Sequence, residues 1–511
     1  MPEAKESGKI VSFLIQRVCI GTICELESVK KIMNDSGRQE TQGRQANQEN
    51  RVASGGASSA QTMDMTHGQP QKLLILFAIP MILGGVFQLL YNTVDTIVVG
   101  RFVSEDALAA IGATSTSTLL INVLGNSFTN AITIIASQAE GAGLSKRIRQ
   151  AMTHSVYMVT AVGVILGLVS FFGARPFMRF LGCDPSIIDL SVLYLHIVCG
   201  LTIFSLWYQG SAALLRGIGD SKTPLYFLIF SSVLNVVLDL VFVLALKQGV
   251  AGVGWATVIS QAVSALICTV YMLKRYPRLR PQAGDWQVDL TMIRDLVHFA
   301  LPMMIQESVL TMGMFVITAV INSFGKDTVA AYAIGSRVEA LAAVAFSRLA
   351  FAFSVYTGQN FGARRYDRIK EGLKKGIPMV AGLAILSSVV VLAFAGPLAS
   401  LFLSDSGSEA LAQATDMIRM EAILYIALGI IYTLTSTLRG IGVVNITLLS
   451  GLFELISKIG CTLLLSPIIG TRGIWLAAPL GWVLGILPSL CWLLWWAKDP
   501  EKHSVKYHRV G

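Results

Sequence analysis

The chain has 511 residues, of which 53% are hydrophobic and only 14% charged, and its mean hydropathy is +0.63. This composition is too apolar for a soluble protein of this length and indicates a polytopic membrane protein. The net charge of +9 lies mainly in short loops between apolar runs, where basic residues set topology, so nucleic-acid binding is not expected. The seven cysteines form no CxxC pair, and we expect neither a disulfide framework nor a metal site.

The first 68 residues are polar and too poor in apolar side chains to bury a core, so residues 1–68 are predicted to be a disordered cytoplasmic extension. Twelve apolar spans follow, each long enough to cross a hydrocarbon core about 30 Å thick. The sequence therefore predicts an all-α polytopic membrane protein with twelve transmembrane helices. Their expected ranges are 73–100, 107–136, 151–174, 189–214, 224–246, 250–273, 296–321, 329–357, 375–395, 413–438, 443–465 and 473–497.

An internal repeat divides the apolar region into two homologous six-helix bundles. Because six is an even number, both bundles have the same orientation in the membrane. Three segments recur at an offset of about 222 residues: FAIPMI (77–82) as FALPMM (299–304), SQAEGAG (137–143) as GQNFGAR (358–364), and LLRGIGD (214–220) as TLRGIG (437–442).

These observations predict five regions: the extension 1–68, an N-terminal lobe 69–273, a cytoplasmic linker 274–295, a C-terminal lobe 296–497 and a cytoplasmic tail 498–511. Lys and Arg gather in alternate loops, notably 146–149, 274–280 and 364–375. By the positive-inside rule we expect both termini in the cytoplasm and a bacterial cell membrane as the location.

Two aspartates lie inside apolar spans of the first half. At 1.5 Å per residue, Asp95, Asp239 and Thr257 each fall about 8 to 10 Å from the outer ends of their spans, and Asn235 stands one turn before Asp239. A carboxylate at a helix centre costs about 2.5 to 3.5 kcal/mol unless it is paired, hydrated or used. Two neighbouring carboxyl groups can hold a proton or offer hard oxygen ligands to Na⁺, while a structural, hydrogen-bonded role remains the alternative.

The repeated spans, YNTVDTIVVGRF (91–102), the SQAEGAG and GQNFGAR pair and LRGIGDSKTP (215–224) resemble the multidrug and toxic compound extrusion (MATE) family over residues 63–498. The resemblance implies two bundles around a central cavity and cation-coupled export of organic compounds. It also implies a first-half cation site at Asp95, Asn235, Asp239 and Thr257. One departure is Glu140, which is expected to be a solvated charge at a cytoplasmic loop.

The second half does not repeat this site, since the repeat offset places Lys458 at the position of Asn235 and Thr462 at that of Asp239. It has acids of its own. Glu454 precedes Lys458 by four residues, which favours a structural ion pair on one helix. Glu307 is a possible second cation site, because some similar transporters use an acid in span seven. Glu421 is expected either to contact substrate or to pair with Arg419.

A substrate cavity is predicted at Gln88, Tyr91, Asn92, Met304 and Gln306. Further Met and aromatic side chains, among them Met303 and Tyr208, could line a cavity for aromatic cations, with helix packing as the alternative. The predicted function is secondary antiport of amphipathic, often cationic, compounds against H⁺ or Na⁺ by a monomer in the lipid bilayer. No P-loop or catalytic constellation is visible, so no cofactor and no enzymatic activity are expected. The alternatives are a flippase for a lipid-linked saccharide, which would want basic residues facing the cavity, and an exporter of a native metabolite. The embedded charges in the sequence are mostly acidic, which favours the antiporter.

Overall fold

The computed structural model describes residues 62–403 and 408–507, and every regular element in these ranges is helical. Ten helices are long and apolar enough to cross a membrane, and two bent pairs bring the number of spans to twelve within the same ranges. The prediction of twelve helical spans is confirmed. The long helices are α2 (Pro70–Phe102), α3 (Glu105–Gly141), α4 (Ser145–Phe180), α7 (Lys222–Leu240), α8 (Gly249–Arg275), α9 (Leu290–Ser323), α10 (Lys326–Gly362), α11 (Tyr366–Ala393), α15 (Val444–Ile469) and α16 (Thr471–Lys498).

The fourth and tenth spans are each broken into two helices. Helices α5 (Ile188–Val198) and α6 (Thr202–Gly217) meet at 43°, and α13 (Glu409–Ala422) and α14 (Tyr425–Ile441) meet at 52°. The two breaks occupy equivalent places in the repeat. The sequence predicts single spans because neither segment contains a proline to mark the break. Two short helices, α12 (Ala395–Ser400) and α17 (Pro500–Ser504), complete the α-helical set.

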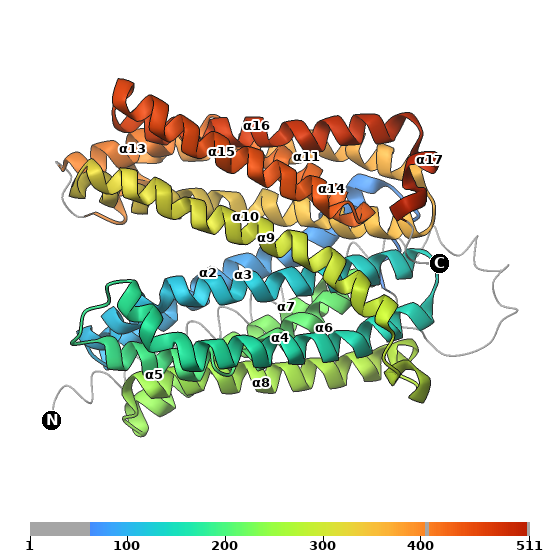
Figure 1. Ribbon diagram of the computed structural model, residues 1–511, viewed down its shortest axis with the longest axis horizontal. Coiled ribbons are helices and arrows are strands. Elements are labelled where there is room, and N and C mark those ends of the chain that lie inside the picture. The colour runs from blue at the N-terminus through green and yellow to red at the C-terminus, as the bar shows by residue number, and fades with distance from the viewer. Residues whose placement is uncertain (1–61, 404–407, 508–511) are drawn as a thin grey trace, which may run out of the picture. The chain divides into compact units, whose positions relative to one another are not determined.

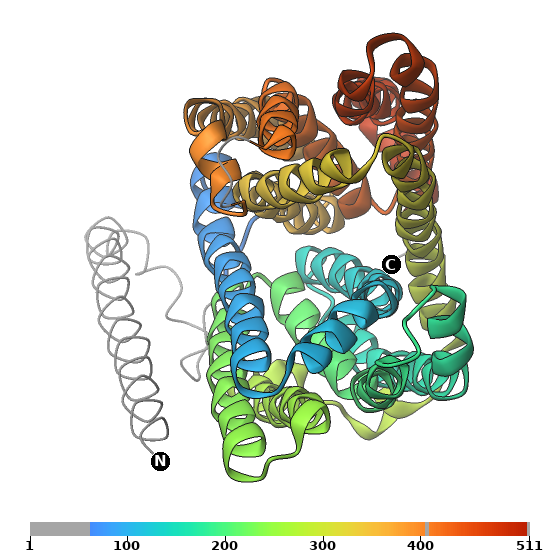
Figure 2. The same ribbon diagram turned by 90° about the vertical axis from the view of Figure 1, so that its left-hand side faces the viewer.

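Helices α3–α8 and α10–α16 form two groups, which Figures 1 and 2 show side by side. The first helix of each repeat crosses between the groups. The start of α2 packs on α10 and α11 and its end packs on α7, while α9 contacts α3 as well as α15. Each of these helices contains a proline at an equivalent repeat position, Pro80 in α2 and Pro302 in α9.

The two lobes contact each other at the end of the molecule that carries residues 62–69 and the segment after α16, here called the terminal face. The ends of α3 and α10 cross so closely that a Cβ at Gly358 would meet Ser137 Oγ at 2.0 Å, and one at Gly362 would meet the carbonyl oxygen of Gln138 at 1.9 Å. The Gln138 side chain donates to the carbonyl of Gly440 at 2.9 Å. The repeated glycine-containing motifs therefore form the contact that joins the lobes.

Part of the predicted N-terminal extension is folded onto the terminal face. Met65 has no exposed surface, its N–H donates to Gln359 Oε1 at 2.8 Å, and its carbonyl accepts from Asn360 Nδ2 at 3.0 Å. Met65 and Thr66, predicted to belong to the extension, are therefore buried against the membrane helices. Residues 1–61 lie outside the described residues, as do the last residues of the tail, 508–511.

The linker between the lobes is a docked segment rather than a solvated loop. Glu140, expected to be solvated, is only 14% exposed at its side chain and pairs with Arg278 of the linker at 2.7 Å. Arg149 of α4 pairs with Asp285 at 2.7 Å, and Thr153 donates to the Asp285 carbonyl at 2.6 Å. Because α8 runs to Arg275 and α9 begins at Leu290, the linker is also shorter than the predicted 274–295.

Candidate functional site

The predicted first-lobe residues meet at one level between α2, α7 and α8. Asp95 lies on α2, Asn235 and Asp239 lie on α7 and Thr257 lies on α8. Asp239 is fully buried and Asn235 is 1% exposed. A short π-helical turn, Val241–Ala245, follows Asp239 directly, a distortion that is frequent at functional sites. The depth estimate from the sequence thus located groups that the fold brings together.

The two carboxyl groups are neighbours without a basic partner. The carboxyl groups of Asp95 and Asp239 lie within interaction distance of each other, and two carboxylates this close favour a shared proton or cation. With the Asn235 amide oriented to satisfy both of its polar atoms, Nδ2 donates to Asp239 Oδ2 at 3.0 Å and Oδ1 accepts from the Thr257 N–H at 3.2 Å. Neither aspartate belongs to an ion pair among the described residues, and Asp95 Oδ1 and Asp239 Oδ1 are both buried without a hydrogen-bond partner there. The carboxyl oxygens of the pair can therefore bind a proton or a hard cation.

Two tyrosines complete this cluster. Tyr91, predicted as a cavity residue, lies one helical turn before Asp95 on α2, within electrostatic range of Asp95 and Asp239. Tyr194 of α5 is 8% exposed and lies within electrostatic range of Asp95 and Asp239. Sequence reasoning missed Tyr194, because one tyrosine in an apolar span gives no signal that separates a site from packing.

The second lobe contains a different cluster with its own internal cation. Glu454 and Lys458 form the predicted ion pair at 2.6 Å. Glu421 is 2% exposed, and one of its oxygens has no hydrogen-bond partner among the described residues. It lies within electrostatic reach of Lys458 and of Glu339 on α10, which sequence reasoning missed. Arg419, the expected partner of Glu421, is exposed and forms no ion pair in the described ranges.

The remaining predicted acid, Glu307, lies outside both clusters. Its side chain is 42% exposed, lines the central cavity and approaches Arg439 at 3.4 Å. Arg439 also donates to Gln306 at 3.3 Å. Glu307 is thus a partner of a cavity arginine, whereas Asp95 and Asp239 face each other.

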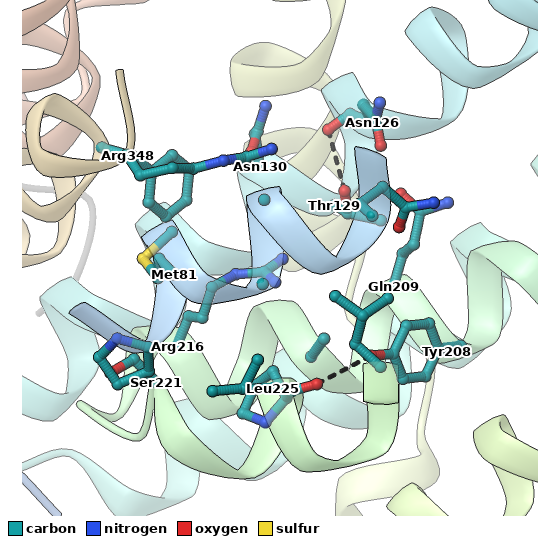
Figure 3. A pocket seen from close by; sticks show the side chains of 18 of the residues that line it. Met81, Asn126, Thr129, Asn130, Tyr208, Gln209, Arg216, Ser221, Leu225 and Arg348 are labelled. Carbon is teal, nitrogen blue, oxygen red and sulfur yellow. Dashed lines mark hydrogen bonds between the residues drawn. The ribbon is translucent and has the colours of Figure 1, made fainter. Parts of the chain in front are cut away.

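A cavity of about 490 Å³ lies between the lobes and is lined by residues of α2, α3, α6, α7, α9, α10 and α14. Figure 3 shows Arg216 and Arg348 reaching into it near Asn130, with Tyr208 and Gln209 on another wall. Three of its lining residues are arginines, Arg216, Arg348 and Arg439. This lining is more basic than predicted, because most of the charged residues within the predicted spans are acidic.

Of the five predicted cavity residues, Gln88 alone lines this cavity. Met303 and Glu307 line it in place of their neighbours Met304 and Gln306. This correction reflects helix geometry, because adjacent helical residues point about 100° apart. Gln306 is buried against Gly451. Asn92 is exposed and its side chain lies 3.4 Å from Gln88 Nε2.

Comparison with known proteins fits this geometry. A family profile, MatE, matches residues 80–241 and 302–463, one match for each repeat. The chain belongs to the MATE family. The probable multidrug resistance protein YpnP of Bacillus subtilis is 28% identical over 416 residues, covering 80% of this chain and 92% of that protein. The FAD transporter of Shewanella oneidensis is 22% identical over 342 residues, covering 65% and 75%.

Solved MATE structures have the same fold. A crystal structure of a MATE protein in the bent conformation superimposes with a TM-score of 0.82 at 21% identity, covering 88% of this chain and all of that chain. MATE proteins are transporters and not enzymes, so this chain is a multi-pass membrane transporter of small organic substrates.

Proposed function

We propose that this MATE protein is a secondary antiporter that exports amphipathic organic compounds while H⁺ or Na⁺ enters through the Asp95–Asp239 pair. The observation that carries the proposal is a pair of neighbouring carboxyl groups, Asp239 fully buried and Asp95 half-buried, with no basic partner among residues 62–403 and 408–507. No other cofactor is needed, since the coupling ion supplies the driving force.

The carboxyl pair can drive a conformational change because its two charge states differ in energy. Two carboxylates about 4 Å apart repel by roughly 4 kcal/mol at an effective dielectric constant of 20, whereas a proton or Na⁺ between them removes the repulsion. A ligand shifts a two-state equilibrium only through its differential affinity for the two states, and about 5.5 kcal/mol moves a ratio of 1:99 to 99:1. Occupancy of this site therefore drives the switch to the extent that the repulsion differs between the two conformations.

Helices α2 and α7 connect the cation site to the cavity. Gln88 on α2 lines the cavity, and Asp95 lies seven residues further along, about 10 Å by helical rise. On α7, Leu228 lines the cavity and Asp239 lies beyond it toward the same end. A Cβ at Gly84 would contact Leu228 at 3.4 Å, so α2 and α7 pack directly against each other at the cavity. A change in the separation of Asp95 and Asp239 therefore changes the wall of the cavity.

The terminal face is proposed to be cytoplasmic, because the basic loops of the sequence lie there. A cysteine introduced at exposed Lys326, at the opposite end of α10, is expected to react with an impermeant reagent from outside. One introduced at exposed Lys374 is expected to react only after permeabilisation. Labelling in the reverse pattern would show that the terminal face is extracellular.

The function is tested with purified protein in liposomes under a proton gradient and a sodium gradient imposed separately. We expect one of the two gradients to drive substrate export and the export to stop when that gradient collapses. Export that needs neither gradient would refute cation coupling. The basic lining of the cavity supports a second candidate function, which is export of a native anionic metabolite.

A further inference from the structure

The charge of the central cavity differs from what a site for organic cations requires. Its charged lining residues are Arg216, Arg348, Arg439 and Glu307, which gives three positive groups against one negative group. A cavity with this balance repels a cationic guest and attracts an anionic one. The acids of the two carboxylate clusters do not line it.

Arg216 has no carboxylate partner in the part of the chain that the structure describes. It belongs to the LRGIG motif of the first repeat, and Arg439 occupies the same place in the second. Its guanidinium carbon lies 5.8 Å from the ring centre of Phe351, and its Nε is buried without a hydrogen-bond partner in the described ranges. A half-buried guanidinium with an unused donor is poised to bind an acceptor.

Arg348 brings a second unpaired guanidinium into the same cavity from the other lobe. It is exposed and forms no ion pair among the described residues. The absence of a side chain at Gly85 leaves room for it, since a Cβ there would meet Arg348 Nε at 3.4 Å and Val344 at 2.8 Å. Arg216 and Arg348 are close enough to repel each other electrostatically. Figure 3 shows both groups directed into the cavity. A shared anion would relieve this repulsion.

Arg439 is only partly neutralised. Its contacts with Glu307 and Gln306 are long, at 3.4 and 3.3 Å, and its Nε is also buried without a partner among the described residues. Glu307 therefore offsets one of the three arginines weakly, and the cavity retains at least two uncompensated positive charges.

The other walls suit the organic body of a substrate. Phe351, Tyr208 and Met81 supply aromatic and apolar surface, while Asn126 and Asn130 supply neutral hydrogen-bonding groups. A volume of about 490 Å³ lies within the range of sites for drug-sized ligands, about 300 to 1,000 Å³.

We propose that the cavity selects amphipathic organic anions that carry a phosphate or carboxylate group on an aromatic or apolar body. Guanidinium groups match the geometry of both anions and can bind them through paired hydrogen bonds. The assignment names the substrate class of the proposed antiporter and rests on that function for transport, but it makes a separate prediction for binding.

The test measures equilibrium binding to the full chain in detergent for FAD and carboxyfluorescein as anions and ethidium as a cation. We expect both anions to bind at least about tenfold more tightly than ethidium, a difference of about 1.4 kcal/mol. Arg348→Gln is expected to weaken anion binding about tenfold and to leave ethidium binding unchanged or stronger. Arg337→Gln is the matched control, because Arg337 lies on the same helix, outside the cavity, against Phe402.

Tighter binding of ethidium than of either anion, or an Arg348→Gln variant with unchanged anion binding, would overturn the assignment. Competition by farnesyl pyrophosphate separates two sources of the same chemistry. Displacement of bound FAD by carboxyfluorescein and by farnesyl pyrophosphate supports the anion site. Binding of farnesyl pyrophosphate without binding of FAD or carboxyfluorescein would overturn the assignment and indicate a site for a lipid pyrophosphate.

Transport separates the two proposals. If FAD and carboxyfluorescein bind but no imposed gradient moves any probe, antiport fails and the anion site stands. If a gradient drives export of ethidium but of neither anion, the anion site fails and antiport stands.

Discussion

The two lobes share one helical plan but differ in the charges buried at matching depth. The first lobe places two aspartates against each other with Asn235 beside them and no basic partner in the described ranges. At equivalent repeat positions the second lobe has Lys458 and Thr462, and its acids, Glu339, Glu421 and Glu454, come from other places on its helices. The two lobes thus share the same helix packing but differ in the chemistry of their buried polar side chains.

This difference assigns the lobes different roles. A cation that approaches the Asp95–Asp239 pair meets no competing positive charge within the described ranges, whereas one that approaches Glu421 meets the ammonium of Lys458. Burial of a carboxylate that lacks a positively charged partner costs more free energy than burial of the neutral carboxylic acid. We therefore expect the second cluster to be structural and the first to respond to the coupling ion.

The largest expected effect on stability is at Lys458. Lys458→Met leaves Glu454 without its partner at 2.6 Å, and the loss of one member of a buried pair costs about 3 to 5 kcal/mol. The double variant Glu454→Gln/Lys458→Met should recover most of this loss. Thermal unfolding in detergent measures both. A Lys458→Met variant as stable as the wild type would show that Lys458 does not neutralise the acids of the second cluster.

A smaller effect, of about 2 kcal/mol, is expected for Asp285→Ala, which removes the ion pair that ties the linker to α4. Against the opposing effect of burial, hydrogen bonds from Gln282 and Arg149 lower the pKa of Asp285. Its stabilisation is therefore present above about pH 4 and is lost as the pH falls through the pKa in the folded protein.

The difference in melting temperature between the wild type and this variant should shrink below about pH 4. Asp416→Ala is the control, because Asp416 pairs with Arg472 at 3.0 Å but both side chains are largely exposed, and such pairs contribute about 0 to 1 kcal/mol. Equal effects of the two variants at neutral pH would contradict a docked linker.

At the first-lobe site, Asn235→Ala removes the amide that donates to Asp239 at 3.0 Å. We expect the apparent affinity for the driving cation to fall about tenfold, or about 1.4 kcal/mol. Asn322→Ala, at an exposed position near the end of α9, is the control and should change nothing. Affinity is obtained from export rates at graded cation concentrations, and an unchanged value would remove Asn235 from the site.

The smallest effect is expected at Thr462, the repeat equivalent of Asp239. Its hydroxyl is buried without a hydrogen-bond partner among the described residues, so Thr462→Val should be neutral or slightly stabilising, by less than about 1 kcal/mol. Thr257→Val in the first lobe should instead impair cation-driven export. Equal impairment by both variants would contradict the functional difference between the lobes.

The sequence predicted the spans and the first-lobe cluster because both depend on distances along a helix axis: hydropathy locates the ends and rise per residue locates Asp95 and Asp239. The sequence did not predict the groupings of residues that depend on tertiary contacts. Arg216 lies two residues past the predicted end of span four, yet it lines the cavity. The partner of Glu140 is in the linker, and Glu339 joins Lys458 only through the packing of α10 against distant helices. Hydrophobic periodicity along one helix does not predict such contacts between helices.

The most direct test of the central claim compares Asp239→Asn with Glu421→Gln. Both changes replace a buried carboxyl group by an amide of the same shape. At equal expression, and with binding of the transported compound measured in parallel, Asp239→Asn is expected to abolish gradient-driven export while retaining binding, and Glu421→Gln is expected to keep most of the export. Full export by Asp239→Asn together with no export by Glu421→Gln would place the coupling site in the second lobe and contradict the account.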